Sequence, residues 1–450
     1  MKRPIVYSLT IAIVIISMSG LSALAATTTS KTSKAPVKAI AAKTTPKTSL
    51  KTPSKTTKTP LKPVRPAVTK KPVFEVGGWI PYWRTATGTK DVLPHLPNMT
   101  TVSPFGYTMK NNGTLFDAAK LTQEPWTSFI AEARRNKVRV IPTVMWGSGE
   151  TIHAILSNDT SRVALEDEIA QVVKTNNFDG IDIDFEGKLA ETRPFFALFL
   201  KGLYQRMGPK FVYCTIEART PLDSRYDSTP PEDATNYAND YAAINKYCDR
   251  VVIMAYDQGA IDVKLNRSRA APYIPVSDPA WVEKVIQIAS DSILKKKIIL
   301  GIATYGYEYS VKPLSEYGYR YDRQWAFNPR YAIELAAVQG ISPIRSSAGE
   351  LSFIYKPTEA TKAIAATSSV STTPNAALTN TPAIPSTIYS QATIAAQFAP
   401  PFNIVVWSDS EAIKDKVELA KRLGIRGVSL FKLDGGEDQN MWNVLPTRGQ

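Results

Sequence analysis

Apolar segments alternate with amphipathic segments from residue 73 to the end of the chain. Eight of the apolar segments have the length and the content of β-branched and aromatic residues that buried strands show. They are residues 76–83, 100–109, 138–146, 180–186, 211–219, 250–257, 298–305 and 427–433. Eight strand–helix repeats over this length predict an α/β fold, a (β/α)8 TIM barrel. In that fold the active site lies at the carboxyl ends of the strands.

The helices between these strands have readable faces and starts. An apolar stripe with helical spacing precedes the fourth strand and consists of Leu165, Ile169, Val172 and Val173. Asp278 stands before Pro279, the order of an N-cap and the first residue of a helix. Asp409 stands in the same way before a helix predicted over residues 410–423. Each of these helices leads into one of the predicted strands.

The interval between the seventh and eighth strands is much longer than one helical crossover requires. Residues 308–407 contain two further strand candidates, 350–355 and 402–407, which we expect to pair as a hairpin. Residues 361–397 between them are rich in Ala, Thr, Ser and Pro, a low-complexity composition typical of an unstructured loop tip. The domain of residues 73–450 is therefore predicted to be a barrel with a small α+β insertion between strand 7 and strand 8.

The fourth predicted strand carries an acidic residue at every second position. Asp182, Asp184 and Glu186 alternate with apolar residues, so their carboxylates point to one face of the strand. Crowded carboxylates disfavour one another's ionisation, which keeps a proton on one of them near neutral pH. A carboxyl group that keeps its proton can act as a general acid. The strand therefore predicts a chemical site rather than packing.

This strand and a second segment resemble the family 18 glycoside hydrolases, the chitinases and related N-acetylglucosaminidases. The family motif Asp-x-x-Asp-x-Asp-x-Glu has counterparts in Asp179, Asp182, Asp184 and Glu186. The family's sixth-strand motif Met-x-Tyr-Asp is matched by Met254, Tyr256 and Asp257. The two motifs occur in the family's order, and the resemblance extends over about residues 74–450.

The resemblance implies a retaining mechanism in which the substrate's own 2-acetamido group attacks the anomeric carbon. Glu186 would be the acid and later the base, and Asp184 would hold the acetamido N–H. Asp182 would buffer the charge of Asp184. Tyr256 would hydrogen-bond the acetamido carbonyl, and Asp257 would bind the sugar.

Further residues of the two motifs have expected roles outside catalysis. Met254 is expected to pack under the sugar, with plain barrel core as the alternative. Asp179 has the wrong strand parity for the cleft, so it and Gly180 are expected to be structural. Glu217 and Arg219 on the fifth strand form a charged pair that is expected to face the cleft, either orienting substrate or bridging to each other.

Aromatic side chains at strand ends are the expected platforms for sugar rings. We expect Trp79, Trp146, Tyr305 and Phe431 to bind substrate, with Tyr82, Trp83, Phe105, Tyr107 and Tyr307 as further candidates. Two positions depart from the family: residues 145–149 read Met-Trp-Gly-Ser-Gly where Ser-x-Gly-Gly is common, and Phe431 stands where a Trp is common. The family's insertion builds one wall of the substrate cleft, which the resemblance implies for residues 308–407.

The formal charge of +14 comes from one end of the chain. Residues 1–72 hold fourteen Lys and Arg and no Asp or Glu, so residues 73–450 carry 40 residues of each sign. A neutral folded part argues against nucleic-acid binding. Residues 1–25 have the charged start, apolar run and Ala-x-Ala end of a secretory signal, with an uncleaved anchor as the alternative. We therefore expect a secreted or cell-surface bacterial protein.

Residues 26–72 consist mainly of Thr, Lys, Pro, Ala and Ser, which predicts a disordered basic linker. Its charge could attract anionic cell-wall polymer, or it could be a spacer. The two cysteines, Cys214 and Cys248, are expected to be buried thiols, with a single bridge as the alternative. His95 and His153 lie in no metal-ligand spacing, so no metal and no cofactor are expected.

These patterns favour a secreted, monomeric hydrolase of β-1,4 linkages at N-acetylglucosamine. Peptidoglycan is the preferred substrate and chitin the alternative. A non-catalytic glycan-binding barrel is the alternative from another class, although such relatives typically lose the acid at the position of Glu186. A metal-dependent phosphoesterase using Asp182 and Asp184 is a third hypothesis.

Overall fold

The computed structural model describes residues 73–110, 112–314, 318–358, 361, 384–385 and 401–448. The predicted signal (1–25), the predicted basic linker (26–72) and most of the low-complexity tip (361–397) lie outside these residues. Within them, no helix combines the length and the apolar character that a membrane span requires.

Eight parallel strands form a closed barrel, as predicted. The strands follow the order β1, β16, β9, β8, β7, β6, β5, β2, and β2 pairs again with β1, which closes the ring. Their bounds are β1 Glu75–Pro81, β2 Thr101–Met109, β5 Thr143–Trp146, β6 Gly180–Phe185, β7 Phe211–Glu217, β8 Arg250–Met254, β9 Ile298–Ala303 and β16 Gly427–Phe431. Each one falls within a predicted segment or within one residue of it. Two short strands, β3 (Leu115–Asp117) and β4 (Arg139–Val140), also pair with β2.

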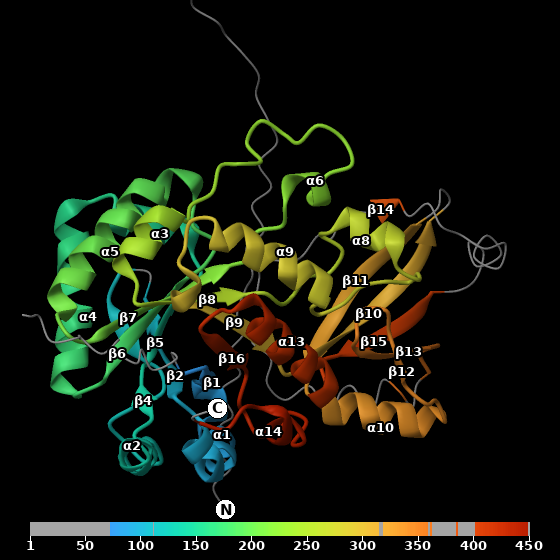
Figure 1. The fold of residues 1–450 in the computed structure, drawn as a ribbon, viewed down its shortest axis with the longest axis horizontal. Coiled ribbons are helices and arrows are strands. Elements are labelled where there is room, and N and C mark those ends of the chain that lie inside the picture. The colour runs from blue at the N-terminus through green and yellow to red at the C-terminus, as the bar shows by residue number, and fades with distance from the viewer. Residues whose placement is uncertain are drawn as a thin grey trace, which may run out of the picture. The chain divides into compact units, whose positions relative to one another are not determined.

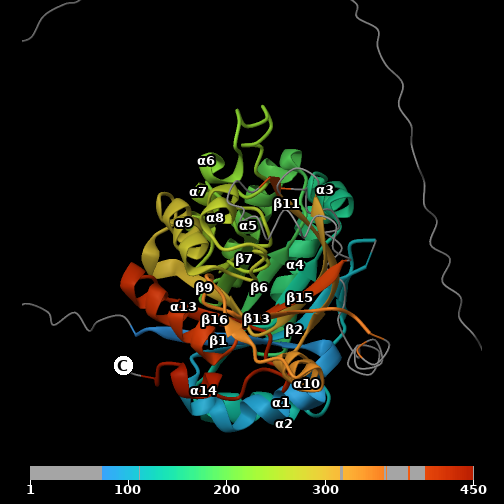
Figure 2. The same cartoon turned by 90° about the vertical axis from the view of Figure 1, so that its right-hand side faces the viewer.

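Helices surround the barrel on its outer side (Figures 1 and 2). Their bounds are α1 Thr85–Val92, α2 Trp126–Arg135, α3 Gly149–Leu156, α4 Asp159–Thr175, α5 Arg193–Met207, α6 Leu222–Arg225, α7 Tyr241–Tyr247, α8 Val263–Ser268, α9 Pro279–Ser290, α13 Ser410–Leu423 and α14 Met441–Val444. Short 3-10 turns are η1 Tyr82–Arg84, η2 Leu93–Asn98, η3 Ala190–Thr192 and η4 Lys295–Lys297.

The helix starts follow the capping chemistry read from the sequence. The Asp278 carboxylate accepts a hydrogen bond from the Ala280 N–H at 2.8 Å, at the start of α9. The Asp409 carboxylate accepts one from the Ala412 N–H at 3.2 Å, at the start of α13. Each bond satisfies a backbone donor that the first helical turn leaves without a partner.

Strand alternation separates the barrel interior from the helix layer. On β6, Ile181, Ile183 and Phe185 are buried in the main apolar core, and the Phe185 ring stacks on Phe199 of α5 at 5.4 Å. The acidic residues between them therefore point into the barrel. Gly180 begins this strand, and a Cβ there would lie 2.2 Å from the Phe211 carbonyl oxygen of β7, so only glycine allows the two strands to approach.

The predicted insertion between the seventh and eighth barrel strands is a second, antiparallel sheet with one helix. Its order is β12, β13, β15, β10, β11, β14. The bounds are β10 Gly306–Leu314, β11 Gly318–Phe327, α10 Pro329–Gln339, β12 Ile344–Arg345, β13 Leu351–Tyr355, β14 Ile384–Pro385 and β15 Phe402–Trp407. The expected hairpin is confirmed, because β13 and β15 pair from Leu351 opposite Trp407 to Tyr355 opposite Asn403. Figure 1 shows this sheet on the side of the barrel away from α4 and α5.

The cysteines are not the two thiols that we expected. Cys214 of β7 and Cys248, which follows α7, form a disulfide with their Cα atoms 6.0 Å apart. Residue Cys214 pairs with Val251 of β8, only three residues after Cys248, so the barrel register itself brings the two side chains together.

Candidate active site

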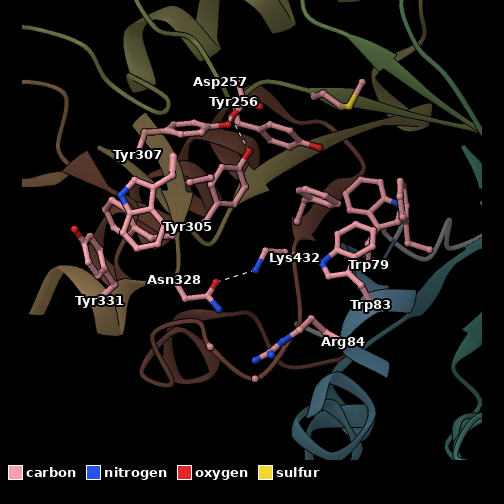
Figure 3. A pocket seen from close by; sticks show the side chains of 18 of the residues that line it. Trp79, Trp83, Arg84, Tyr256, Asp257, Tyr305, Tyr307, Asn328, Tyr331 and Lys432 are labelled. Atoms are coloured by element: carbon pink, nitrogen blue, oxygen red, sulfur yellow. Dashed lines mark hydrogen bonds between the residues drawn. The ribbon is translucent and has the colours of Figure 1, made fainter. Parts of the chain in front are cut away.

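A cavity of about 800 Å³ opens at the carboxyl ends of the barrel strands. Its walls come from β1 and η1, the ends of β5, β6 and β8, the turn after β9, the residues that follow β16, and the insertion. The lining includes Trp79, Trp83, Arg84, Met145, Asp184, Glu186, Met254, Tyr256, Asp257, Tyr305, Tyr307, Trp325, Asn328, Tyr331, Phe431 and Lys432 (Figure 3). Its volume lies within the range of about 300–1,000 Å³ that is usual for small-molecule sites.

Asp182 lies beneath the cavity and ties three strands together. Its Oδ2 accepts hydrogen bonds from Trp79 Nε1 at 3.1 Å and from Thr143 Oγ1 at 2.8 Å. Its Oδ1 accepts one from Thr215 Oγ1 at 2.8 Å. Burial raises the pKa of Asp182, although these three hydrogen bonds act in the opposite direction. The carboxyl is fully occupied by the protein and is not free to contact substrate.

Asp184, two residues further on, lines the cavity and lacks such partners. Its side chain is 3% exposed, and its Oδ1 is buried without a hydrogen-bond partner among the residues that the structure describes. Burial, and then the negative charges of Glu186 and Asp182, raise its pKa well above the usual range. A buried acceptor without a donor is costly, so this oxygen is suited to receive an N–H or O–H from a bound molecule.

Glu186 follows directly after β6 and is the most accessible of the three acids. Burial, and then the negative charge of Glu217, raise the pKa of Glu186 to about 7, while Lys188 acts in the opposite direction. A large share of the carboxyl therefore keeps its proton up to about pH 7, which is the state that a general acid needs.

The expected sugar-binding motif forms a hydrogen-bonded tyrosine cluster at the end of β8, which is separated from β6 by β7. Asp257 adopts a left-handed backbone conformation, with φ of 58°. Its Oδ1 accepts hydrogen bonds from Tyr305 Oη at 2.6 Å and Tyr307 Oη at 2.8 Å (Figure 3). Burial, and then the Asp184 charge, raise the pKa of Tyr256 well above its usual value, so its hydroxyl stays a donor.

Three of the four expected aromatic platforms line the cavity: Trp79, Tyr305 and Phe431. The Phe431 ring lies nearly parallel to that of Tyr256, with centroids 5.9 Å apart and an interplanar angle of 13°. Trp79 is 2% exposed and uses its N–H on Asp182, so it forms the cavity floor.

Trp146 does not line the cavity, and this expectation is corrected. Its ring packs edge-on against Phe185 at 5.3 Å, and its Nε1 donates to Thr151 Oγ1 of α3 at 3.1 Å. The reason is strand parity: Trp146 pairs with Phe185, which points into the helix layer. The neighbouring Met145 pairs with Asp184 and takes the cavity position. Tyr107, a lesser candidate, is also absent from the lining.

Two motif residues with expected roles outside catalysis, Asp179 and Met254, lie where strand alternation places them. Asp179 is at the opposite end of β6 from the cavity, and its carboxylate accepts a hydrogen bond from the Val140 N–H at 2.8 Å. Met254 lines the cavity beside Tyr256 and is half-buried.

Glu217 and Arg219 do not bridge to each other; both hold the loop before α7. Glu217 accepts hydrogen bonds from the Gly187 N–H at 3.0 Å and from Asn239 Nδ2 at 2.7 Å. Arg219 donates to the Asn239 carbonyl oxygen. Its Cζ also lies 3.9 Å from the ring centroid of Tyr237 and 3.7 Å from that of Tyr241. Neither residue lines the cavity. Glu217 instead contacts the residue that follows Glu186.

The sequence of residues 77–436 matches the model of the glycosyl hydrolases family 18. The chain belongs to glycosyl hydrolase family 18. It is therefore a glycosidase, and its barrel is the fold of that family.

Curated relatives of this family 18 glycosidase are distant in sequence. The uncharacterized glycosylase YvbX of Bacillus subtilis is 24% identical over 299 residues, which cover 66% of this chain and 69% of YvbX. A cortical fragment-lytic enzyme of B. subtilis is 24% identical over 356 residues, 78% of this chain and 68% of that enzyme. The putative sporulation-specific glycosylase YdhD of B. subtilis is 26% identical over 227 residues, and the match spans about half of YdhD, 48%.

Solved structures share the fold. The spore cortex-lytic enzyme SleL of Bacillus megaterium has a TM-score of 0.59 and 22% identity, covering 86% of this chain and 77% of SleL. A chitinase of Chromobacterium violaceum has a TM-score of 0.59 and 18% identity, covering 83% of this chain and 98% of the chitinase.

Several residues lining the family 18 site were not identified from the sequence. Met145 and Lys432 adjoin expected residues, and strand parity could have assigned Met145. Others come from the insertion, which lines the cavity as the resemblance implied, among them Arg323, Trp325, Asn328 and Tyr331. Trp325 and Tyr331 both donate to the buried Glu308, at 2.9 and 2.6 Å, which fixes them on the wall. These contacts join β10 to residues of β11 and α10 that are 17 and 23 positions away, so no pattern within one element reveals them.

Metal binding finds no support in the part of the chain that the structure describes. There, no group of three or more His, Cys, Asp or Glu side chains is arranged to hold an ion. The residues of the third hypothesis, Asp182 and Asp184, differ in their surroundings, since the oxygens of Asp182 are bonded to hydroxyl and indole donors.

Proposed function

We propose that this glycosidase cleaves β-1,4 linkages at N-acetylglucosamine in peptidoglycan glycan strands, with retention of configuration and with the 2-acetamido group as the attacking group. The observation that carries the proposal is the Oδ1 of Asp184, which has no hydrogen-bond donor within the described part of the chain and lies in the cavity that also contains Glu186. An N-acetyl sugar brings the N–H donor that this oxygen lacks.

Protonation begins the proposed reaction. Glu186, whose pKa is raised to about 7, gives its proton to the glycosidic oxygen while the bond from that oxygen to C1 breaks. The acetamido carbonyl oxygen forms a bond to C1 from the other face of the ring. Asp184 accepts the acetamido N–H and so orients the attacking group, and Tyr256 directs its hydroxyl to the same group.

Water completes the cycle. The Glu186 carboxylate takes a proton from water as the water oxygen attacks C1, and the bond between C1 and the acetamido oxygen breaks. Two inversions at C1 leave the configuration as it was. Glu186 is protonated again, so the enzyme returns to its starting state.

Two observations favour peptidoglycan over chitin as the substrate: the descriptions of the relatives and the basic segment of this chain. Three of the named relatives are described as cortical fragment-lytic, cortex-lytic or sporulation-specific. The basic segment of residues 26–72 suits attraction to anionic wall polymers. We further propose that residues 1–25 direct export, so that the enzyme acts at the cell surface or outside it.

A Glu186→Gln variant tests the catalytic proposal. We expect kcat on N-acetylglucosamine-containing glycans to fall about 10²- to 10⁴-fold, because glutamine cannot transfer a proton, while oligosaccharide binding persists. The matched control is Glu418→Gln, which removes a carboxylate from the exposed face of α13. Reducing-end release from purified sacculi and from chitin oligomers measures both variants. Equal activity of Glu186→Gln and wild type would contradict the proposed acid.

The glycan-binding alternative makes the opposite prediction. A lectin on the same barrel would release no reducing ends from either substrate, and Glu186→Gln would bind as the wild type does. Release from chitin oligomers alone would leave the mechanism intact and replace peptidoglycan by chitin.

A further inference from the structure

Charges in the cavity are separated into two groups. The acids Asp184, Glu186 and Asp257 lie at the ends of β6 and β8, where the proposed chemistry occurs, and the remaining acid of the lining, Glu334, pairs with Arg330. The cations lie elsewhere on the wall and are Arg84 of η1, Arg323 of β11, Arg330 of α10 and Lys432 after β16. Neither the family 18 mechanism nor the expected sugar platforms use these cations.

Two of the four cations interact with other side chains of the protein. Arg330 is 85% exposed in its side chain and pairs with Glu334 at 2.6 Å. Arg323 lies over the ring of Tyr307, 5.3 Å from its centroid. Arg84 and Lys432 remain, and Figure 3 shows them with Asn328 around one part of the cavity.

Lys432 is held rigidly with its ammonium group at this wall. Its side chain is 10% exposed, and Nζ donates to Asn328 Oδ1 at 2.8 Å and to the Asp434 carboxylate. Asn328 Nδ2 in turn donates to Asp434 at 3.3 Å. Burial would raise the pKa of Asp434, but the Lys432 charge lowers it, so Asp434 stays ionised. An ammonium group fixed in this way is pre-organised for a further acceptor.

Arg84 has a donor without an acceptor. Its Nε is buried and makes no hydrogen bond within the described residues, and the nearest carboxylate oxygen, Asp434 Oδ2, is 3.9 Å away. A buried guanidinium N–H without a partner is costly, and a bound anion would satisfy it. Arg84, Lys432 and Asp434 together carry a net charge of +1, because two cations face one carboxylate.

We propose that Arg84 and Lys432 form a subsite for a carboxylate carried on the 3-O substituent of a sugar next to the cleaved bond. The proposal rests on the proposed function, since peptidoglycan places such a substituent on every second sugar and chitin has none. The carboxylate has two sources, the free lactyl ether of N-acetylmuramic acid or the acidic residues of an attached stem peptide. Both offer the planar oxygen pair that a guanidinium recognises.

Substrate preference of an Arg84→Gln variant tests the subsite. We compare kcat/KM for three tetrasaccharides: alternating N-acetylglucosamine and N-acetylmuramic acid with free lactyl groups, the same glycan with stem peptides, and chitotetraose. For each muramoyl glycan we divide kcat/KM by the kcat/KM of chitotetraose. This ratio is expected to fall roughly tenfold for the glycan whose carboxylate is bound, because the variant loses about one charge-assisted hydrogen bond. Arg84→Lys should recover part of the loss.

The control variant is Arg135→Gln, which removes an exposed guanidinium of α2 and the same unit of charge. Its substrate ratios should equal those of the wild type. An unchanged ratio in Arg84→Gln for both muramoyl glycans overturns the subsite while leaving the proposed function in place.

Inhibition of the wild-type enzyme gives a second test that needs no variant and no muramoyl substrate. N-acetylmuramic acid should inhibit chitotetraose cleavage roughly tenfold more strongly than its lactyl methyl ester, which has the same shape without the charge. This result would support the subsite even if peptidoglycan were not cleaved. Equal inhibition by the acid and the ester would rule the subsite out.

Discussion

Single side chains at the strand ends set the acidity of their neighbours. Besides burial, the groups that shift the pKa of Glu186 are Glu217 on β7, Asp257 after β8 and Lys188, and only Lys188 is positively charged. Glu217 is itself kept ionised: burial opposes this, but Lys188 and the Asn239 hydrogen bond lower its pKa. An ionised Glu217 therefore helps to keep the proton on Glu186.

A Glu217→Gln variant should move the pH dependence of kcat. Removing the negative charge lowers the pKa of Glu186 from about 7, and the acid form is then lost at a lower pH. The alkaline limb of the kcat profile is expected to shift toward acid by several tenths of a pH unit or more. Glu191→Gln, an exposed carboxylate of η3, is the control. A shift toward alkaline pH would contradict this role of Glu217.

Residue-level expectations succeeded where strand parity was applied. Asp182, Asp184 and Asp179 lie on the sides of β6 that alternation assigns. Trp146 was expected in the cavity because it is large and near a strand end, but alternation along β5 sends it to the helix layer. The different surroundings of Asp182 and Asp184 had no signal in the sequence, since Trp79 and Thr215 are far from them along the chain.

At the level of elements, the sequence predicts the features that depend on only a few neighbouring residues. All eight barrel strands and the starts of α9 and α13 were predicted, because apolar runs and N-cap residues act over a few positions. The insertion sheet was predicted only as one hairpin. Its central strand β10 pairs with β11 and β15, and the β15 pairing joins residues about ninety to a hundred positions apart. Pairing at that separation depends on side chains that no single segment contains.

The segment that follows β16 should make stability depend on pH. Burial, and then the carboxyl of Asp91, raise the pKa of Glu437 from 4.5 to about 9. The folded state then binds a proton that the unfolded state has lost between these two values, so the stability from this group falls as pH rises from about 4.5 to 9.

Glu437→Gln should remove that dependence, because glutamine resembles the protonated side chain at every pH. Between about pH 6 and pH 8, the Tm of the wild type is expected to fall more steeply than that of the variant. Differential scanning calorimetry at several pH values measures both slopes. Parallel slopes would show that Glu437 ionises in the folded protein as it does in the unfolded chain.

At the level of the whole molecule, the net charge and the chemistry belong to different parts of the sequence. The excess of +14 lies in residues 1–72, and the domain with the cavity has as many acidic as basic residues. We therefore expect attachment to the wall and hydrolysis to be separable functions.

Deletion of residues 26–72 tests this separation. The variant should bind isolated cell walls less than the full chain at about 50 mM salt, and the two should converge at about 500 mM, because screening removes the electrostatic attraction. Cosedimentation with walls measures binding, and cleavage of soluble oligosaccharides should be the same in both proteins. Wall binding that is insensitive to salt would contradict the electrostatic role.

Asp182 joins β1, β5 and β7 through three donors, and it does so directly beneath the two residues proposed to carry out catalysis. A shift of any one of these strands by a single residue would turn its donor to the outside and remove one of the three hydrogen bonds to the buried carboxyl. Enzymatic turnover would then report correct barrel assembly more sensitively than compactness or helix content does. Among refolded preparations that look native by spectroscopy, turnover alone would then distinguish correctly assembled barrels from the others.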